Sequence, residues 1–122
     1  MKNVLLDTNI LICHLNGDQK ATDLLLKLDR IRISVMSEYE ILAGLTEARN
    51  TQKQAAVDLL KISVIYQVTS SIVRQAAEYS IKYGGKKTVD RIIAATLREH
   101  RLKALVTLNS ADFPMVKTVD YL

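Results

Sequence analysis

The sequence predicts an α/β fold, a three-layer α/β/α sandwich with a central parallel sheet of four to five strands. The run Val4–Leu6 is apolar without alternation, as expected for a strand buried on both faces of a sheet. Further along, short apolar strands alternate with amphipathic helices, which favours parallel pairing through right-handed crossovers. A chain of 122 residues suffices for one compact core but not for two ordinary domains, so we expect a single domain over residues 1–122.

The spacing of apolar residues and the turn residues between them predict each element in turn. The first half contains a strand at 4–6, a helix at 10–15, a Gly17-Asp18 turn and cap, a helix at 21–28, a strand at 31–35, a helix from Ser37 to about Glu47, and a helix from Thr51 to about Leu60. The second half contains a strand at 63–68, a helix from Ser70 or Ser71 to Tyr83, a Gly84-Gly85 stop, a helix at 89–100, a strand at 104–107, a break at Phe113-Pro114, and an edge strand at 118–121.

Composition narrows the class of protein. No apolar run approaches the roughly 20 residues needed to cross a bilayer, and the N-terminus lacks a secretory signal, so we expect a soluble, cytoplasmic protein without membrane contact. Cys13 is the only cysteine, which excludes an intrachain disulfide and a cysteine-based zinc cluster. The net charge of +4 and pI of about 9.3 favour a polyanionic partner, although many unrelated domains share this balance.

Four carboxylates are expected at one edge of the predicted sheet. The carboxyl ends of parallel strands lie along the same edge, where ligands of open α/β sheets bind. Asp7 follows the first strand and Asp112 lies in the loop after the strand at 104–107. Glu40 falls in the first turn of the helix after the second strand, and Asp90 in the first turn of the helix before the fourth.

Each carboxylate also has a structural explanation. Asp7 could be an ordinary helix N-cap, and Ser37-x-x-Glu40 fits a capping box. Asp90 could interact favourably with the positive end of the helix macrodipole, and Asp112 could form an Asx turn. Taken singly, these explanations are at least as good as a catalytic one.

Asp90 is the hardest of the four to explain by structure alone. It shares the apolar face of its helix with Ile93, Ala94 and Leu97, so its carboxylate faces the protein. A buried, unpaired carboxylate costs several kcal/mol, so a positive group is expected nearby. Glu40 similarly lies among small residues, where we expect a neighbouring backbone to approach closely.

Four converging acids repel one another, and a divalent cation would relieve that repulsion. Oxygen ligands without clustered His or Cys suit Mg²⁺ or Mn²⁺ rather than zinc or copper. Such an ion can activate water for in-line attack on a phosphodiester and neutralise the leaving oxygen. The residues therefore point to hydrolytic nuclease chemistry.

Four motifs resemble those of the PIN-domain ribonucleases, most closely the VapC-type toxins of type II toxin-antitoxin pairs. They lie in the family's order and span essentially the whole chain: Leu6-Asp7-Thr8-Asn9, Ser37-Glu38-Tyr39-Glu40-Ile41-Leu42-Ala43-Gly44, Asp90-Arg91-Ile92-Ile93-Ala94-Ala95-Thr96, and Leu105-Val106-Thr107-Leu108-Asn109-Ser110-Ala111-Asp112-Phe113. Two positions depart from the pattern. Position 109 is Asn where some relatives carry Asp, and Leu108 replaces a frequent Arg.

The resemblance implies that the predicted sandwich is PIN-like and that the protein is a Mg²⁺- or Mn²⁺-dependent ribonuclease. It implies that Asp7, Glu40, Asp90 and Asp112 form the catalytic and metal-binding cluster. It implies a set of supporting polar residues as well: Thr8, Asn9, Ser37, Thr107 and Asn109. It further implies a homodimer and a small VapB-like antitoxin that covers the cleft.

Lys86, Lys87 and Arg91 flank Asp90 and are candidate contacts for the RNA phosphates next to the scissile one, although an ordinary solvated surface remains the simpler explanation for each. His14 and His100 have no partner at metal-ligand spacing and are interpreted as structural.

Two rival functions remain open at this stage. The first is a PIN nuclease that processes RNA or cleaves DNA without a toxin role. The second is a non-catalytic metal-binding or phosphoacceptor module of the receiver kind, which is disfavoured because no paired acids follow the first strand and no phosphoacceptor Asp follows the third.

Overall fold

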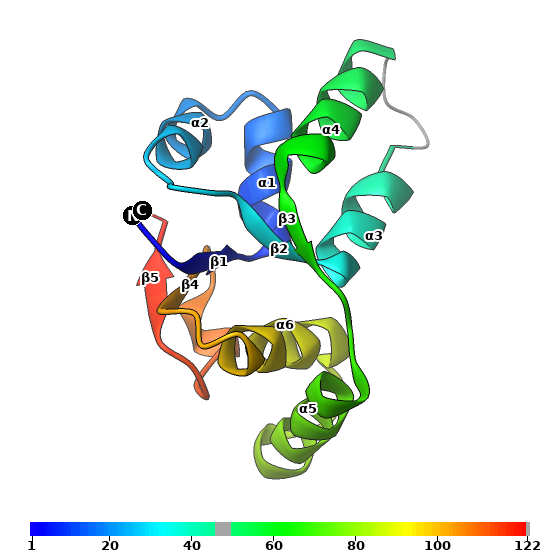
Figure 1. Cartoon of the computed structure of the whole chain (residues 1–122), viewed down its shortest axis with the longest axis vertical. Coiled ribbons are helices and arrows are strands. Elements are labelled where there is room, and N and C mark those ends of the chain that lie inside the picture. Colours follow the sequence, from blue (N-terminus) through cyan, green and yellow to red (C-terminus); the bar gives the residue numbers. More distant parts are fainter. Residues whose placement is uncertain (46–49, 122) are drawn as a thin grey trace.

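The computed structural model describes residues 1–45 and 50–121. Strands and helices alternate along the chain (Figure 1). In order, they are β1 (Val4–Leu6), α1 (Thr8–Leu15), α2 (Gln19–Leu26), β2 (Arg32–Ser34), α3 (Val35–Ala43), α4 (Asn50–Ile62), β3 (Val64–Tyr66), α5 (Ser70–Tyr83), α6 (Thr88–Glu99), β4 (Ala104–Thr107), the 3₁₀ turn η1 (Ser110–Asp112) and β5 (Thr118–Asp120).

All strand pairs found among the described residues are parallel, as the alternation of elements predicts. β4 lies between β1 and β5, and β2 pairs with β3. β1 and β2 contact one another, but the described strands form hydrogen-bonded sets of three and two rather than one continuous ladder. Strands of three residues offer few backbone groups, so the twist between neighbours readily interrupts the ladder.

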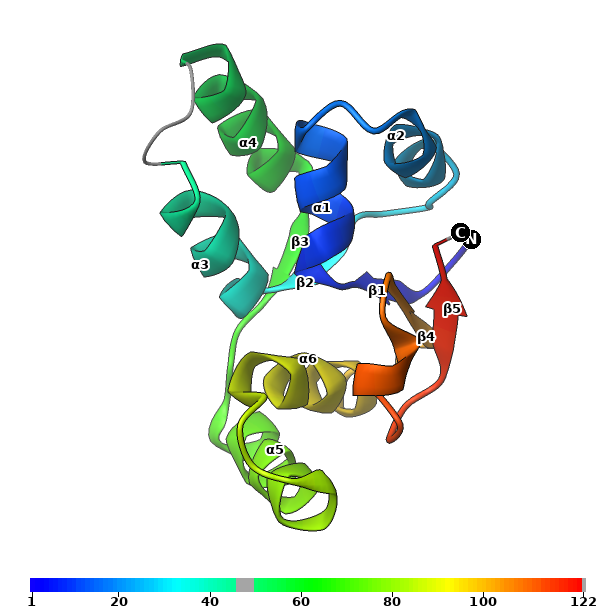
Figure 2. The same cartoon turned by 180° about the vertical axis from the view of Figure 1, so that it is seen from behind.

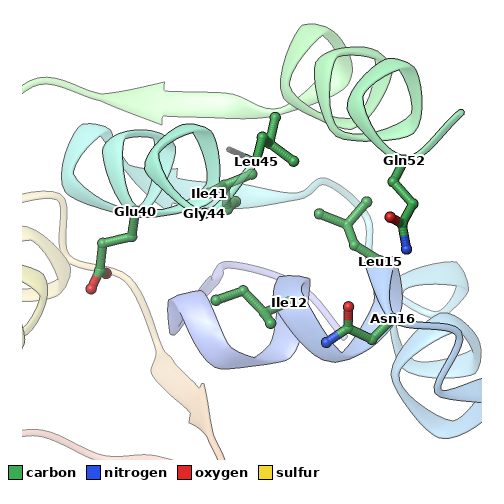
Figure 3. Close-up of a pocket in the computed structure, with 8 residues that line it drawn as sticks. All are labelled: Ile12, Leu15, Asn16, Glu40, Ile41, Gly44, Leu45 and Gln52. Atoms are coloured by element: carbon green, nitrogen blue, oxygen red, sulfur yellow. The ribbon is translucent and has the colours of Figure 1, made fainter. Parts of the chain in front are cut away.

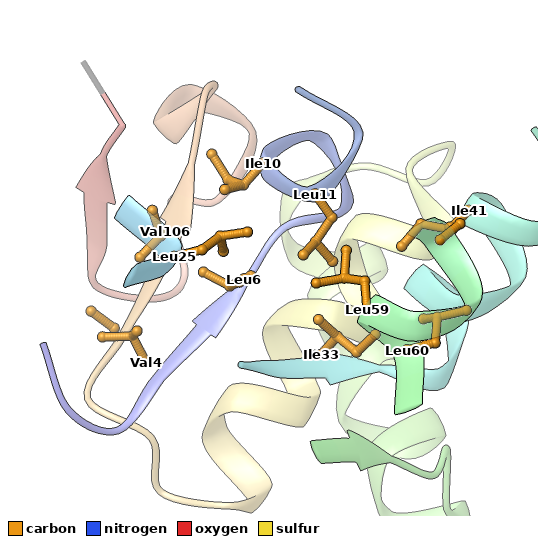
Figure 4. Packing of buried hydrophobic residues seen from close by; sticks show 12 residues of the cluster. Val4, Leu6, Ile10, Leu11, Leu25, Ile33, Ile41, Leu59, Leu60 and Val106 are labelled. Atoms are coloured by element: carbon orange, nitrogen blue, oxygen red, sulfur yellow. The ribbon is translucent and has the colours of Figure 1, made fainter. Parts of the chain in front are cut away.

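The helices cover both faces of the strands, which confirms the three-layer α/β/α arrangement. In Figures 1 and 2, α1, α2 and α4 lie on one side and α5 and α6 on the other. Alternate residues of β1 divide between the two cores. Val4 and Leu6 pack with Ile10 and Leu11 of α1 (Figure 4), whereas Leu5 packs against Ile93 of α6 and its neighbours.

The second strand ends earlier than predicted, and the third helix begins earlier. β2 ends at Ser34, so Val35 belongs to the helix and not to the strand. The Ser34 hydroxyl caps α3 by accepting a hydrogen bond from the Met36 N–H at 3.1 Å, so Ser37 lies inside the helix and does not begin it. Glu47, the predicted helix end, is outside the described residues.

The other predicted elements occur with small shifts at their ends. Asp18 caps α2 as predicted, since its side chain accepts from the Lys20 N–H at 2.9 Å. Gly84 ends α5 with a φ of 101°, a conformation that suits glycine. None of the helices formed by residues 1–45 and 50–121 combines the length and apolar character needed to cross a bilayer.

Candidate active site

Asp7 lies directly after β1 and is almost fully buried, with 5% of its surface exposed. Its backbone N–H bonds the Val106 carbonyl at 3.0 Å, which continues the pairing of β1 with β4. Although Asp7 occupies the N-cap position of α1, its side chain makes no capping hydrogen bond. Its Oδ2 instead accepts from the Thr107 hydroxyl at 2.9 Å. The N-cap explanation therefore accounts for the position of Asp7 but not for its side chain.

The environment of Asp7 opposes ionisation. Burial raises the pKa of Asp7 above its ordinary value, and the negative charges of Glu40 and Asp112 raise it further. The Thr107 hydrogen bond offsets part of this effect. These interactions place two predicted acids, Glu40 and Asp112, within electrostatic range of Asp7, although the three come from separate segments of the chain.

Thr8 connects α1 to α3 through a buried polar network. Its hydroxyl oxygen lies 2.6 Å from Oε1 of Glu40 and 2.8 Å from Oγ of Ser37. A hydroxyl has one proton, so Thr8 can donate to only one of these oxygens at a time. The contacts fix Ser37 and Glu40 beside Asp7, and they show that the capping-box interpretation is wrong.

Asp90 is half-buried in the first turn of α6 and faces the other acids. Burial, followed by the charges of Asp7 and Asp112, raises the pKa of Asp90 from 3.8 to about 6, against the opposing effect of Lys87 and Arg91. No hydrogen bond to its carboxylate is found within residues 1–45 and 50–121. Asp90 is thus a carboxylate pressed among like charges, and the cations expected near it are present.

Asp112 ends η1, where both of its carboxylate oxygens have partners. Asn109 donates its Nδ2 to Oδ2 at 2.7 Å, and Lys87 donates its Nζ to Oδ1 in an ion pair. Asn109 is itself anchored, because its backbone N–H donates to the Thr107 hydroxyl oxygen at 3.0 Å. In the part of the chain that the structure describes, no backbone N–H donates to the Asp112 carboxylate, so the Asx-turn explanation is wrong.

Arg91 does not lie at the surface as a candidate RNA contact would. It is 5% exposed, and its guanidinium donates from Nη1 to the Asp112 carbonyl at 3.0 Å and from Nη2 to the Gly84 carbonyl at 3.5 Å. Its Nε is buried without a partner among the described residues. Arg91 therefore ties η1 to the loop between α5 and α6.

The remaining predicted residues, Asn9 and Lys86, are exposed, and Lys87 is exposed beside Asp112. Among the described residues, the acids do not already converge as a preformed set of metal ligands. The chemistry of the donor set nevertheless fits a hard divalent cation: the carboxylates of Asp7 and Asp112 lie within electrostatic range of Asp90, whose own carboxylate has no hydrogen-bond donor among the described residues. Side chains would have to move to bring these oxygens onto one ion.

A largely apolar groove of about 290 Å³ opens beside Glu40. Figure 3 shows that its walls come from α1, α3 and the start of α4. It is lined by Ile12, Leu15, Asn16, Glu40, Ile41, Gly44, Leu45 and Gln52. Among residues 1–45 and 50–121, a side chain added at Gly44 would meet only carbonyl oxygens of its own helix within 4 Å, so no other described element makes the close approach expected there. Gly44 keeps the groove open instead.

Comparison with known proteins identifies the family. The model of the PIN domain matches residues 4–117. The chain belongs to the PIN domain family. This PIN domain is 33% identical to Ribonuclease VapC19 of Mycobacterium tuberculosis over 120 residues, which cover 91% of this chain and 92% of that protein. It is 31% identical to Ribonuclease VapC10 of the same organism over 119 residues, which cover 92% and 86%.

Solved structures share the fold over the full chain. A toxin-antitoxin complex from Klebsiella pneumoniae contains a chain with a TM-score of 0.84 and 29% identity, and the match covers 98% of both chains. DNA-bound VapBC from Salmonella typhimurium gives a TM-score of 0.77 with 100% of both chains covered; at 21% identity it supports the fold alone. The family predicted from the four motifs is therefore confirmed.

Two features of the site were not predicted from the sequence. The first is the structural use of Arg91, whose signal is its helical spacing with Ala94 and Ala95, both of which are buried. The second is the pairing of Lys87 with Asp112, which are 25 residues apart and carry no local signal of contact.

Proposed function

We propose that residues 1–122 form one nuclease domain, a divalent-metal-dependent endoribonuclease that acts as the toxin of a toxin-antitoxin pair. The observation that carries the proposal is the similarity of nearly the whole chain to two proteins named ribonucleases. The acidic edge formed by Asp7, Glu40, Asp90 and Asp112 supports it, since nucleases need such an edge to hold a cation against a phosphodiester.

In this proposal, Asp7, Asp90 and Asp112 hold Mg²⁺ or Mn²⁺ directly or through water, and Glu40 completes the cluster as a ligand or by orienting the attacking water. A bound ion would supply Lewis-acid stabilisation of the negative charge that develops on the phosphate and the leaving oxygen. The raised pKa values of Asp7 and Asp90 support this assignment, because a bound cation favours the ionised form that burial disfavours.

The polar neighbours hold the acids in place. Thr107 fixes Asp7, Thr8 fixes Glu40, and Asn109 fixes one oxygen of Asp112. Ser37 supports Thr8 from inside α3. The exposed Lys86 and Lys87 are proposed to contact the phosphates that flank the scissile bond, where cations position RNA without reading its sequence.

A small antitoxin protein is the proposed regulator. The toxin-antitoxin complex from Klebsiella pneumoniae contains a chain that matches this protein over 98% of both chains. The groove beside Glu40 would accept an apolar segment of such a partner and bring it over the acids. Following the family resemblance, we propose that the toxin is a homodimer and that it works in the cytoplasm on cellular RNA.

The experiment is RNA cleavage by the purified protein. We expect cleavage with Mg²⁺ or Mn²⁺, loss of cleavage on chelation, and at least a ~100-fold loss of rate in Asp7→Asn and Asp90→Asn, as for the removal of groups that stabilise charge in the transition state. Asp58→Asn, an exposed acid on α4, is the matched control and should cleave normally. Unchanged cleavage by the Asp7 and Asp90 variants would defeat the assignment.

Growth of cells separates the toxin role from RNA processing or DNA cleavage. Induction of the protein should arrest growth, and co-expression of a small protein encoded beside it should restore growth. Sequencing of RNA ends from arrested cells would identify the cut. A harmless protein with full ribonuclease activity would favour the processing role.

A further inference from the structure

Two cationic side chains contact Asp112, and they bind different parts of the residue. Arg91 donates to its backbone carbonyl, whereas Lys87 pairs with its side-chain carboxylate. The two cations lie four residues apart at the start of α6, so one short segment controls both the backbone and the side chain of a proposed metal ligand.

The Arg91 contact is built into the core. The residue is 5% exposed, and its guanidinium also bonds the Gly84 carbonyl, so breaking the contact would leave a buried cation and two carbonyls unpaired. This contact anchors the backbone of η1 whatever the carboxylate binds.

The Lys87 contact is exchangeable. The Lys87 side chain is 51% exposed and that of Asp112 is 24% exposed, so water can replace either partner. Ion pairs of this exposure contribute little to stability, because solvent screens them and the lysine loses side-chain freedom. Lys87 also follows Gly84-Gly85, where an added Cβ would meet nothing within 4 Å, so neighbouring side chains do not crowd these two positions.

We propose that Lys87 is a replaceable counter-ion: it neutralises Asp112 before a divalent metal binds, and the metal must displace it from the carboxylate. This inference rests on the proposed metal-dependent function. Oδ2 of Asp112 accepts from the neutral Asn109 amide, whereas Oδ1 pairs with the Lys87 ammonium, so Oδ1 is the oxygen at which a cation meets a competing charge. The ammonium and the divalent ion repel each other, so an ion bound at that oxygen disfavours the Lys87 contact.

Displacement would also prepare the site for its substrate. Once released, the Lys87 ammonium remains tethered at the edge of the acidic cluster, within reach of an RNA phosphate that approaches the ion. The Lys87 ammonium would thus pair with the Asp112 carboxylate in the free protein and with an RNA phosphate in the complex with RNA.

The test is a titration of the metal-free, full-length protein with Mn²⁺. The electron paramagnetic resonance signal of free Mn²⁺ measures how much of the ion remains unbound. We expect Lys87→Gln to bind Mn²⁺ about fivefold more tightly than the wild type, a change of the size given by the loss of an exposed ion pair. Lys86→Gln, which removes the adjacent exposed lysine, should change affinity less than about twofold. In an Asp112→Asn background, Lys87→Gln should have no effect.

The outcomes separate this inference from the proposed function. If the wild type binds Mn²⁺ but Lys87→Gln binds it equally or more weakly, the competition is refuted while the metal site stands. An equal gain in Lys86→Gln, or a gain that persists in Asp112→Asn, would mean general electrostatics and would also refute it. If neither wild type nor Lys87→Gln binds Mn²⁺, the proposed metal site fails, and the competition fails with it.

Discussion

Asp90 shows why an acidic cluster without a cation destabilises the fold that carries it. Its pKa rises from 3.8 to about 6 because burial and the charges of Asp7 and Asp112 oppose ionisation. The folded protein therefore binds a proton more tightly at this site than the unfolded chain does. Stability from this group is present below pH 4 and is lost as pH rises from about 4 to about 6.

Asp90→Asn should accordingly stabilise the metal-free protein at neutral pH. With a chelator present, we expect the free energy of unfolding at pH 7.5 to rise by about 1 kcal/mol, a value reduced from the full pKa shift because the group is partly solvated. The gain should vanish near pH 4, where the wild-type carboxyl is protonated. Urea denaturation across this pH range measures it, and a variant less stable than the wild type at pH 7.5 would contradict the assignment of charge strain to Asp90.

Thr107 is the residue whose hydroxyl makes burial of Asp7 tolerable. Thr107→Val keeps the shape but removes the donor to Asp7 Oδ2 and the acceptor of the Asn109 N–H, so we expect a loss of about 2 kcal/mol in unfolding free energy. Thr96→Val is the matched control, since within the described part of the chain that buried hydroxyl bonds only the Ile92 carbonyl of its own helix, and its loss should be smaller than about 1 kcal/mol. Equal losses in the two variants would show that the Asp7 contact has no special weight.

At the scale of elements, the residue at which a helix begins was less predictable than the side of the helix that is buried. The sequence predicts that the third helix begins at Ser37, and Ser37-x-x-Glu40 matches a capping box. The structure uses Ser34 because Thr8 reaches across from α1 to contact both Ser37 and Glu40. A tertiary contact thus overrides a local motif, and a contact over about 30 residues leaves no trace in local spacing.

The tether between η1 and the α5–α6 loop depends on Arg91. Arg91→Met keeps most of the apolar stem but removes the donors to the Asp112 and Gly84 carbonyls. We expect faster hydrogen exchange at the Asp112 and Phe113 amides, which bond within this turn, by about tenfold as local opening becomes easier. Arg98→Met, an exposed site on the same helix, should leave these amides unchanged. Unaltered exchange in Arg91→Met would mean that η1 is held by other contacts.

For the whole molecule, the sheet edge was predictable and its contacts were not. The non-alternating Val4–Leu6 strand predicts a parallel sheet, and parallel strands bring residues after their carboxyl ends to one edge regardless of sequence separation. Asp7 and Asp90 accordingly lie within electrostatic range although 83 positions separate them. Which oxygen each neighbour contacts depends on rotamers and loop geometry, which sequence spacing does not specify.

A divalent ion should stabilise the whole fold through this edge. A ligand that binds only the folded state at 100 times its Kd adds about 2.7 kcal/mol, so Mg²⁺ at that ratio should raise the Tm of the wild type by several degrees. Asp90→Asn should lose most of this shift, whereas Asp58→Asn should keep it. Thermal denaturation with and without Mg²⁺ measures the effect, and a full shift in Asp90→Asn would place the ion elsewhere.

The most direct measurement is an anomalous difference map from crystals grown with Mn²⁺. We predict a peak at the carboxyl edge of the sheet, about 2.0 to 2.6 Å from carboxylate oxygens of Asp7, Asp90 or Asp112, the range of metal-oxygen contacts for hard divalent cations. A protein that cleaves RNA with Mn²⁺ while its crystals show no ion at this edge, or an ion bound only at another site, would contradict the account.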